Sequence, residues 1–200
     1  GFLGRNALLR LAAVFRGSQE PRDALGRAWT AAKNIVTQIQ DGLPSPVVGI
    51  ACGPAHDGLV GTADNLLYMI DGHAIALAMR LLGANQGYGT KILTVGDELP
   101  SEIDGNLSRW LDVIRLKGTN GPEKLHEIMT GDIASARRLK DAFARVYEAY
   151  RNQDFDAVEQ LATSLLEEFP DDAPAKLLKG RAAHLKANPP QWDGVQKWTQ

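Results

Sequence analysis

The sequence predicts an α/β fold, with a mixed α/β domain over residues 1–131 and an all-helical tail over residues 132–200. Two observations lead to this division. Before Gly131, short apolar runs typical of strands alternate with helix-length patterns. Beyond it, apolar residues recur only at the three- and four-residue spacing of a helix. We therefore expect a mainly antiparallel sheet within residues 7–130 and helices within residues 134–187.

The first half of the chain alternates between strand and helix patterns. The short apolar run at 7–15 is interpreted as a strand or as half of a hairpin. Pro21 suits the first turn of a helix, and Gly42 suits the stop that follows it. The continuous apolar run at 47–53 predicts a strand that is covered on both faces.

The patterns that follow predict a turn at 57–58, a second short strand at 59–61 and a helix over 72–82. Three glycines, at positions 83, 87 and 89, are expected to end that helix. Three more strands are predicted at 91–95, 110–116 and 124–129, the last two forming a hairpin.

The tail resembles a single tetratricopeptide-like repeat. Its first helix carries an apolar stripe that includes Phe143, Asp154 caps the second, and Pro170 ends it. A third helix is expected from 174 to 186. Because one such repeat cannot bury its own apolar face, we expect the tail to pack on the first domain or on a protein partner.

Composition excludes several classes of protein. With 44% hydrophobic and 23% charged residues, the chain is typical of a globular protein. A net charge of −2 without a Lys/Arg run indicates no nucleic-acid partner. No apolar run predicts a membrane segment. The single cysteine, Cys52, excludes an intrachain disulfide and fits a reducing, cytoplasmic location.

Five short motifs follow one another in an order and spacing that resemble the class III adenylate/guanylate cyclases. They are GIACGP at 49–54, GLVG at 58–61, YMIDGHAIALAMR at 68–80, YGTKIL at 88–93 and LKG at 116–118. The resemblance covers roughly residues 1–130 and matches the back portion of the family domain, so we expect an N-terminally incomplete domain. PQWDGV at 190–195 resembles the helical end of many bacterial cyclases.

The resemblance implies a ferredoxin-like α/β sandwich that works as a head-to-tail dimer. In the family, the ribose 3′-hydroxyl attacks the α-phosphate of ATP or GTP, and pyrophosphate leaves. Two aspartates hold two metal ions, Mg or Mn, that carry this reaction. The partner subunit supplies an Asn and, four residues later, an Arg that stabilise the transition state, together with purine-selecting residues and a phosphate-binding Lys.

Most of these family positions are altered here. The altered positions are Leu9 at the second metal aspartate, Met69 at a purine-selecting residue, Ala76 at the transition-state Asn and Thr119 at the second Lys of the Lys-Gly motif. A leucine cannot ligate magnesium, which prefers oxygen ligands, so no cofactor is expected for this chain. Arg80 is retained as a catalytic candidate and Lys117 as a substrate-binding candidate. The commoner explanation for Arg80 is a surface arginine, and the commoner explanation for Lys117 is a solvated lysine in a turn.

Three functions remain open from the sequence. The first is a degenerate cyclase-like domain in cyclic-nucleotide signalling, regulatory or dimerising rather than catalytic, paired with itself or with another cyclase domain. The second is an active adenylate cyclase, making cAMP and pyrophosphate from ATP, in its complete form. The third is a protein-binding scaffold that acts through the tail. The helix over 72–82 has a second apolar row, Leu77 and Leu81, so we expect a dimer partner to cover it.

Overall fold

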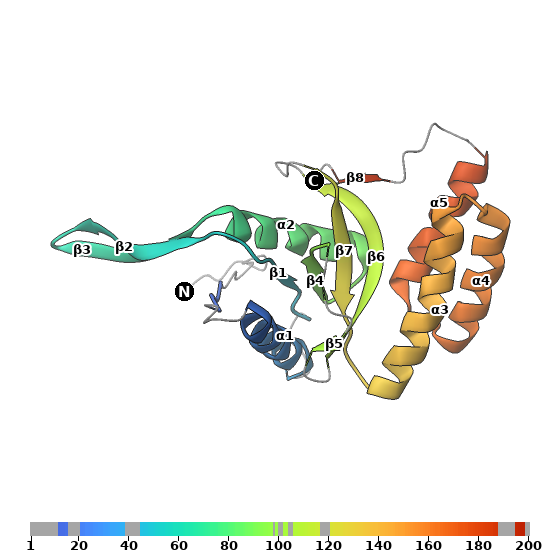
Figure 1. Ribbon diagram of the computed structural model, residues 1–200, viewed down its shortest axis with the longest axis horizontal. Helices are drawn as coiled ribbons and strands as arrows, with labels where there is room; N and C mark the ends of the chain where they lie inside the picture. The colour runs from blue at the N-terminus through green and yellow to red at the C-terminus, as the bar shows by residue number, and fades with distance from the viewer. Residues whose placement is uncertain are drawn as a thin grey trace, which may run out of the picture.

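The computed structural model describes residues 12–15, 21–38, 45–97, 99, 102–103, 106–116, 121–187 and 195–198. Within them the chain forms a mixed α/β fold, as predicted, with five helices, a six-stranded mixed sheet and a separate two-stranded hairpin (Figure 1). The helices are α1 (Pro21–Thr37), α2 (His73–Tyr88), α3 (Ile133–Arg151), α4 (Phe155–Glu168) and α5 (Ala173–Ala187). The strands are β1 (Val48–Ile50), β2 (His56–Thr62), β3 (Asn65–Asp71), β4 (Ile92–Val95), β5 (Glu102–Ile103), β6 (Asn106–Leu116), β7 (Glu123–Ile128) and β8 (Gln196–Trp198).

The six-stranded sheet has the order β1-β4-β7-β6-β5, and β8 pairs with β6. Strand β1 runs parallel to β4, and β8 runs parallel to β6, whereas the β4–β7, β7–β6 and β6–β5 pairs are antiparallel. The predicted strand at 91–95 and the predicted hairpin of 110–116 and 124–129 correspond to β4, β6 and β7. Strand β6 is longer than predicted at its start.

Helix α2 belongs to the crossover that connects the parallel strands β1 and β4, as parallel pairing requires. A Cβ on Gly49 would lie 2.2 Å from the carbonyl oxygen of Ala78, so only a glycine lets β1 approach the helix this closely. The fully buried Asn85 donates from its amide to the carbonyl oxygen of Val48 at 3.0 Å and accepts from the Thr90 hydroxyl at 2.9 Å. These contacts fix the end of α2 against β1.

Helices cover both faces of the sheet. Trp29 of α1 lies in one apolar cluster with Ile92 of β4, whereas Leu93 lies in a second cluster with α2 and the three tail helices. Successive side chains of a strand point to opposite faces, so α1 covers one face and α2 with the tail covers the other. The tail therefore packs on the sheet of its own chain, which confirms the first of the two predicted possibilities.

Acidic side chains cap the tail helices, and one of these caps was predicted. Asp154 accepts from the Ala157 amide at 3.0 Å and caps α4, as predicted, and Asp132 caps α3 by accepting from the Ser135 amide at 2.8 Å. The prediction that the tail is helical throughout is wrong at 196–198. There the chain forms β8, which pairs with the edge of β6 and satisfies backbone groups that the edge leaves open.

Around the β2–β3 hairpin, the predicted strand at 59–61 lies within β2, but the predicted turn is wrong. The Asp57-Gly58 pair does not turn but lies inside β2, because β2 and β3 pair continuously from His56↔Asp71 to Thr62↔Asn65. The turn falls at 63–64. Strand β3 was not predicted.

Helix α2 also differs from its prediction. The glycines at 83 and 87 lie inside it, and only Gly89, whose φ of 66° is left-handed, ends the helix. Residues 12–15 form no strand, while the rest of the run at 7–15, and Gly42, lie outside the described residues. Among the helices that the structure describes, none combines the length and the apolar character needed to cross a membrane.

Candidate functional site

Of the residues that the motif resemblance singled out, those that the structure describes lie on β3 and α2. Met69 lies on β3, and Ala76 and Arg80 lie on α2, one helical turn apart and therefore on the same face. The Ala76 methyl group can neither donate nor accept a hydrogen bond. Arg80 is half-buried, and no carboxylate among the described residues pairs with it. Leu9, Lys117 and Thr119 lie outside the described residues.

The described histidines lie on different elements, among them His56 on β2, His73 on α2 and His126 on β7. Within the part of the chain that the structure describes, no group of three or more His, Cys, Asp or Glu side chains could hold a metal ion. Cys52 lies in the run at 47–53 that was predicted to be a strand covered on both faces, but it is exposed. The strand ends at Ile50, two residues before it.

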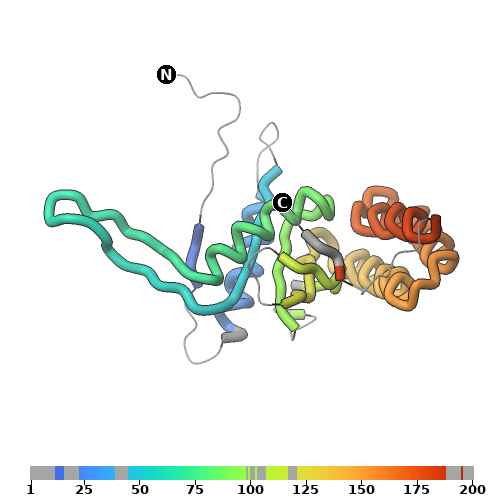
Figure 2. The backbone as a smooth tube through the Cα atoms, turned by 90° about the horizontal axis from the view of Figure 1, so that it is seen from above, coloured from blue at the N-terminus to red at the C-terminus, as the bar shows by residue number. Residues whose placement is uncertain are grey.

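A two-stranded arm, formed by β2 and β3 over residues 56–71, extends away from the rest of the molecule (Figure 2). Six large apolar side chains along it are between 49% and 65% exposed. They are Leu59, Val60, Leu66, Leu67, Tyr68 and Met69. An isolated hairpin is only marginally stable in water, so a hairpin of this kind gains stability when another surface covers it.

Both faces of the arm are apolar. Directly paired residues of an antiparallel hairpin lie on the same face, and neighbouring pairs alternate between faces. One face carries the Leu59–Tyr68 pair and Leu66, and the other carries the Val60–Leu67 pair and Met69. Neither face is packed as an interior, since all these side chains are exposed.

The arm carries charge of one sign. Between residues 56 and 71 there are three aspartates and no Lys or Arg. The Tyr68 hydroxyl donates to the Asp57 carboxylate, and Asp71 accepts from the Gly72 amide at 2.8 Å. A surface that binds the arm should therefore be apolar with cationic side chains around it.

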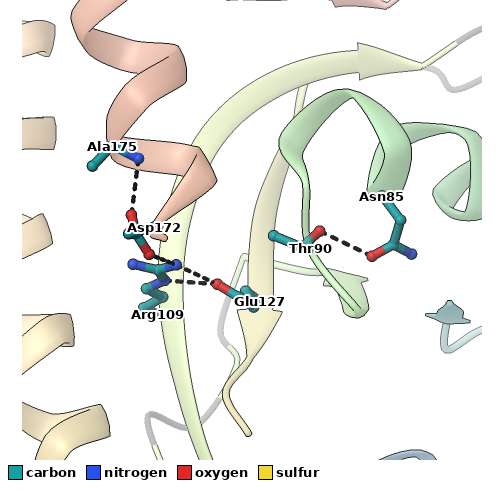
Figure 3. A network of polar contacts seen from close by, with 6 residues as sticks. All are labelled: Asn85, Thr90, Arg109, Glu127, Asp172 and Ala175. Atoms are coloured by element: carbon teal, nitrogen blue, oxygen red, sulfur yellow. Dashed lines mark hydrogen bonds and ion pairs between the residues drawn. The ribbon is translucent and has the colours of Figure 1, made fainter. Parts of the chain in front are cut away.

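A first buried ionic cluster, the Arg109 cluster, joins the sheet to α5 (Figure 3). Arg109 of β6 lies 2.7 Å from the Glu127 carboxylate of β7 and 2.6 Å from that of Asp172. Asp172 also accepts from the Ala175 amide at 2.9 Å and so caps α5. Burial raises the pKa of Glu127, and the positive charge of Arg109 opposes that rise.

A second buried cluster, the Asp112 cluster, lies further along β6. The Asp112 carboxylate accepts from Arg181 of α5 at 2.7 Å and from the Tyr88 hydroxyl of α2 at 2.5 Å. Burial raises the pKa of Asp112, and the charge of Arg181 opposes that rise. The guanidinium carbon of Arg181 also lies 5.2 Å from the centre of the Tyr88 ring, within range of a cation–π contact.

Comparisons with known proteins add no relative: no family model matches the chain, and no curated protein matches it.

The prediction that a dimer partner covers the second apolar row of α2 is wrong. Leu77 and Leu81 are already buried within this chain, in the core that α2 shares with the sheet and the tail. Ile75 and Leu82, which form the other apolar row of α2, are only half-buried. The exposed apolar surface lies instead on the arm, whose second strand the sequence patterns did not indicate.

The two ionic clusters were also not found from the sequence. Arg109 and Asp112 lie in a strand that was predicted to begin only at 110. Their partners, Asp172 at the cap of α5 and Arg181 within α5, lie far along the chain. A sequence signal did exist, since Arg109 and Asp112 interrupt the apolar run of β6. Charged residues in a run that must be buried need partners of opposite charge.

Proposed function

We propose that this chain is a degenerate class III cyclase-like domain that acts in cyclic-nucleotide signalling as a regulatory or dimerising partner rather than as a catalyst. The motif series supports the family, and Ala76 and Met69 argue against catalysis because neither side chain can supply the hydrogen bonds of the family residues. The observation that carries the proposal is the exposed apolar arm.

The exposed side chains of the arm give the proposal its energetic basis. Burying a side chain of this size contributes about 1.5–3 kcal/mol. Six such side chains on one hairpin represent a substantial driving force for association, even after the cost of binding is subtracted. An apolar projection without a cover is typical of an interaction site.

The partner that we propose is a second cyclase-like domain, either another copy of this chain or an intact cyclase. The charges of the arm favour contact between the arm and the body of the partner. Two arms laid against each other would bring Asp57, Asp64 and Asp71 of one close to the same residues of the other. A head-to-tail arrangement avoids this repulsion and is the one that the family resemblance implies.

Sedimentation velocity tests the proposal. The chain alone, or mixed with a catalytically competent class III cyclase domain, should sediment as a dimer at concentrations well above micromolar. The variant Val60→Thr/Leu67→Thr/Met69→Thr removes the apolar groups of one face but keeps strand-forming residues, and it should weaken association at least tenfold.

The matched control is Ile35→Gln, which removes an apolar side chain of α1 that is 51% exposed. It should leave association unchanged. A wild-type chain that stays monomeric both alone and in the mixture would exclude the proposal, as would an equal effect of the arm variant and the control.

A further inference from the structure

Helix α5 and strand β6 carry opposite charges in matching order. Asp172, which caps the amino end of α5, pairs with Arg109 of β6 at 2.6 Å. Further along the helix, Arg181 pairs with Asp112 of β6 at 2.7 Å. The strand therefore presents a cation followed by an anion, and the helix presents an anion followed by a cation.

The spacing of the charges allows both pairs to form together. Asp172 and Arg181 are nine residues apart, which corresponds to about 13 Å along a helix. Arg109 and Asp112 are three residues apart in β6, but a β-bulge between Trp110 and Asp112 places them opposite Glu127 and Leu125, two residues apart on β7, which corresponds to about 7 Å along a strand. Both pairs form only when the amino end of α5 lies at Arg109.

Other placements of α5 lose both pairs. If the helix ran in the opposite direction, Asp172 would face Asp112 and Arg181 would face Arg109. A shift by one helical turn, about 5.4 Å, would separate both pairs, leaving Arg109 with Glu127 alone and Asp112 with the Tyr88 hydroxyl alone. The side chains of Arg109, Asp172 and Asp112 are at most 4% exposed, so water cannot replace the lost contacts.

The end of α2 supplies a third fixed contact. The Tyr88 hydroxyl bonds to Asp112, and the next residue, Gly89, lies directly against Ala173, the first residue of α5. The two charge pairs and this close approach all lie on the inner face of α5. The apolar residues of the same interface, by contrast, are not directional.

We propose that Arg109, Asp112, Asp172 and Arg181 form a docking key that makes the helical tail close over the sheet in one register and one direction. Apolar burial supplies most of the free energy of docking, and the key selects the arrangement. The tail helices of the same chain thereby keep this face of the sheet covered. This inference does not depend on the proposed cyclase-like function.

The experiment replaces the charges and keeps the hydrogen-bond acceptors. The neutral variant combines Arg109→Met, Asp112→Asn, Glu127→Gln, Asp172→Asn and Arg181→Met. Asparagine at position 172 can still cap α5, and at position 112 it can still accept from Tyr88. Nitroxide labels on Cys52, the single native cysteine, and on Gln160→Cys in α4 report the position of the tail relative to the sheet.

Pulsed electron paramagnetic resonance then gives the distance distribution between the labels. The key predicts one narrow population in the charged protein, and a broad or split distribution in the neutral variant at unchanged helical circular dichroism. A narrow distribution with the same mean in both proteins would overturn the proposal. The control pair Arg138→Met/Glu168→Gln removes an exposed ion pair between α3 and α4, and should leave the distribution narrow.

If the neutral variant loses its helical signal, Arg181→Met alone decides the question by hydrogen exchange. Because Arg181 is the most exposed member of the key, its loss is the mildest change. The key predicts that α5 amides lose at least tenfold more protection than β4 amides, since the tail undocks locally. An equal loss in both elements would show that the charges stabilise the whole fold without selecting a register.

Discussion

Gly89 lies against Ala173, where the end of α2 meets the beginning of α5. Gly89 has a φ of 66°, in the left-handed region, and a Cβ built on it would lie 2.4 Å from the Cβ of Ala173. Glycine is therefore required at position 89 for two reasons: the backbone is left-handed, and there is no space for a side chain. This contact joins the helix of the crossover to the helical tail.

The first prediction concerns this contact. Gly89→Ala should reduce the free energy of unfolding by about 2–4 kcal/mol, because left-handed strain and overpacking add. Adding Ala173→Gly should recover the overpacking part and leave the strain. Urea unfolding measures both changes.

The matched control is Gly180→Ala, in α5, where an added Cβ meets nothing within 4 Å. It should stabilise the protein by about 0.5–1 kcal/mol, since alanine is the better helix former. If Gly89→Ala is as stable as Gly180→Ala, the close approach of Gly89 to Ala173 does not constrain the fold.

Local signals allowed much of the fold to be predicted. Pro21 marks the start of α1, the apolar run at 91–95 marks β4, and Asp154 marks the start of α4. Each of these depends on residues within a few positions of one another. The change near Gly131 from mixed to helical periodicity likewise placed the beginning of the tail helices.

The remaining features depend on contacts that sequence patterns do not contain. Asp57-Gly58 resembles a turn, yet pairing with β3 keeps it extended. Arg109 and Asp112 are acceptable in a buried strand only because Asp172 and Arg181 fold back onto it. For the candidate site, the motifs placed Arg80 and Ala76 on one helix, but the arm was not predictable because its second strand has no clear alternation.

The second prediction concerns acid sensitivity. The His126 ring donates from Nε2 to the Gly96 carbonyl at 3.1 Å, and burial, with nearby lysines contributing, lowers the pKa of His126 to about 4. Because the unfolded chain takes up a proton near pH 6.5, it binds more protons than the folded state between pH 6.5 and 4. His126 therefore lowers the free energy of unfolding by about 3 kcal/mol as the pH is lowered from 6.5 to 4. Above pH 6.5 this loss is absent.

Comparing the wild type with His126→Gln isolates this effect, because a glutamine amide can still donate to Gly96. The variant should lose less stability between pH 6.5 and 4. Asp112 and Glu127 act with the opposite sign, since their pKa values are raised and ionisation destabilises the fold as the pH rises through them. They are common to both proteins and cancel. If the free energy of unfolding depends on pH in the same way in both proteins, His126 is not the source of the acid sensitivity.

The third prediction concerns chemistry. Incubated with ATP or GTP and Mg²⁺ or Mn²⁺, the purified chain should make no cyclic nucleotide above a control without protein, because Ala76 and Met69 cannot replace the family residues. Its melting temperature should not depend on either metal. Measurable turnover that disappears in Arg80→Ala would favour the alternative, an active cyclase.

The fourth prediction concerns the dependence of association on salt. In a head-to-tail dimer the acidic arm contacts cationic side chains on the body of the partner. This contact should weaken as salt rises from about 50 mM to 500 mM, because salt screens the attraction between opposite charges. Contact between two acidic arms should strengthen over the same range. Asp64→Asn at the tip of the arm should reduce the slope without abolishing association. Sedimentation equilibrium at several salt concentrations distinguishes the two arrangements.

The most direct test of the central claim is hydrogen exchange of the arm as a function of protein concentration, with and without a competent cyclase domain. If the arm is the interface, amides of β2 and β3 should exchange more slowly as association proceeds, while those of α1 remain unchanged. Arm amides that exchange at one rate under all these conditions, including those in which the chain is associated, would contradict the account.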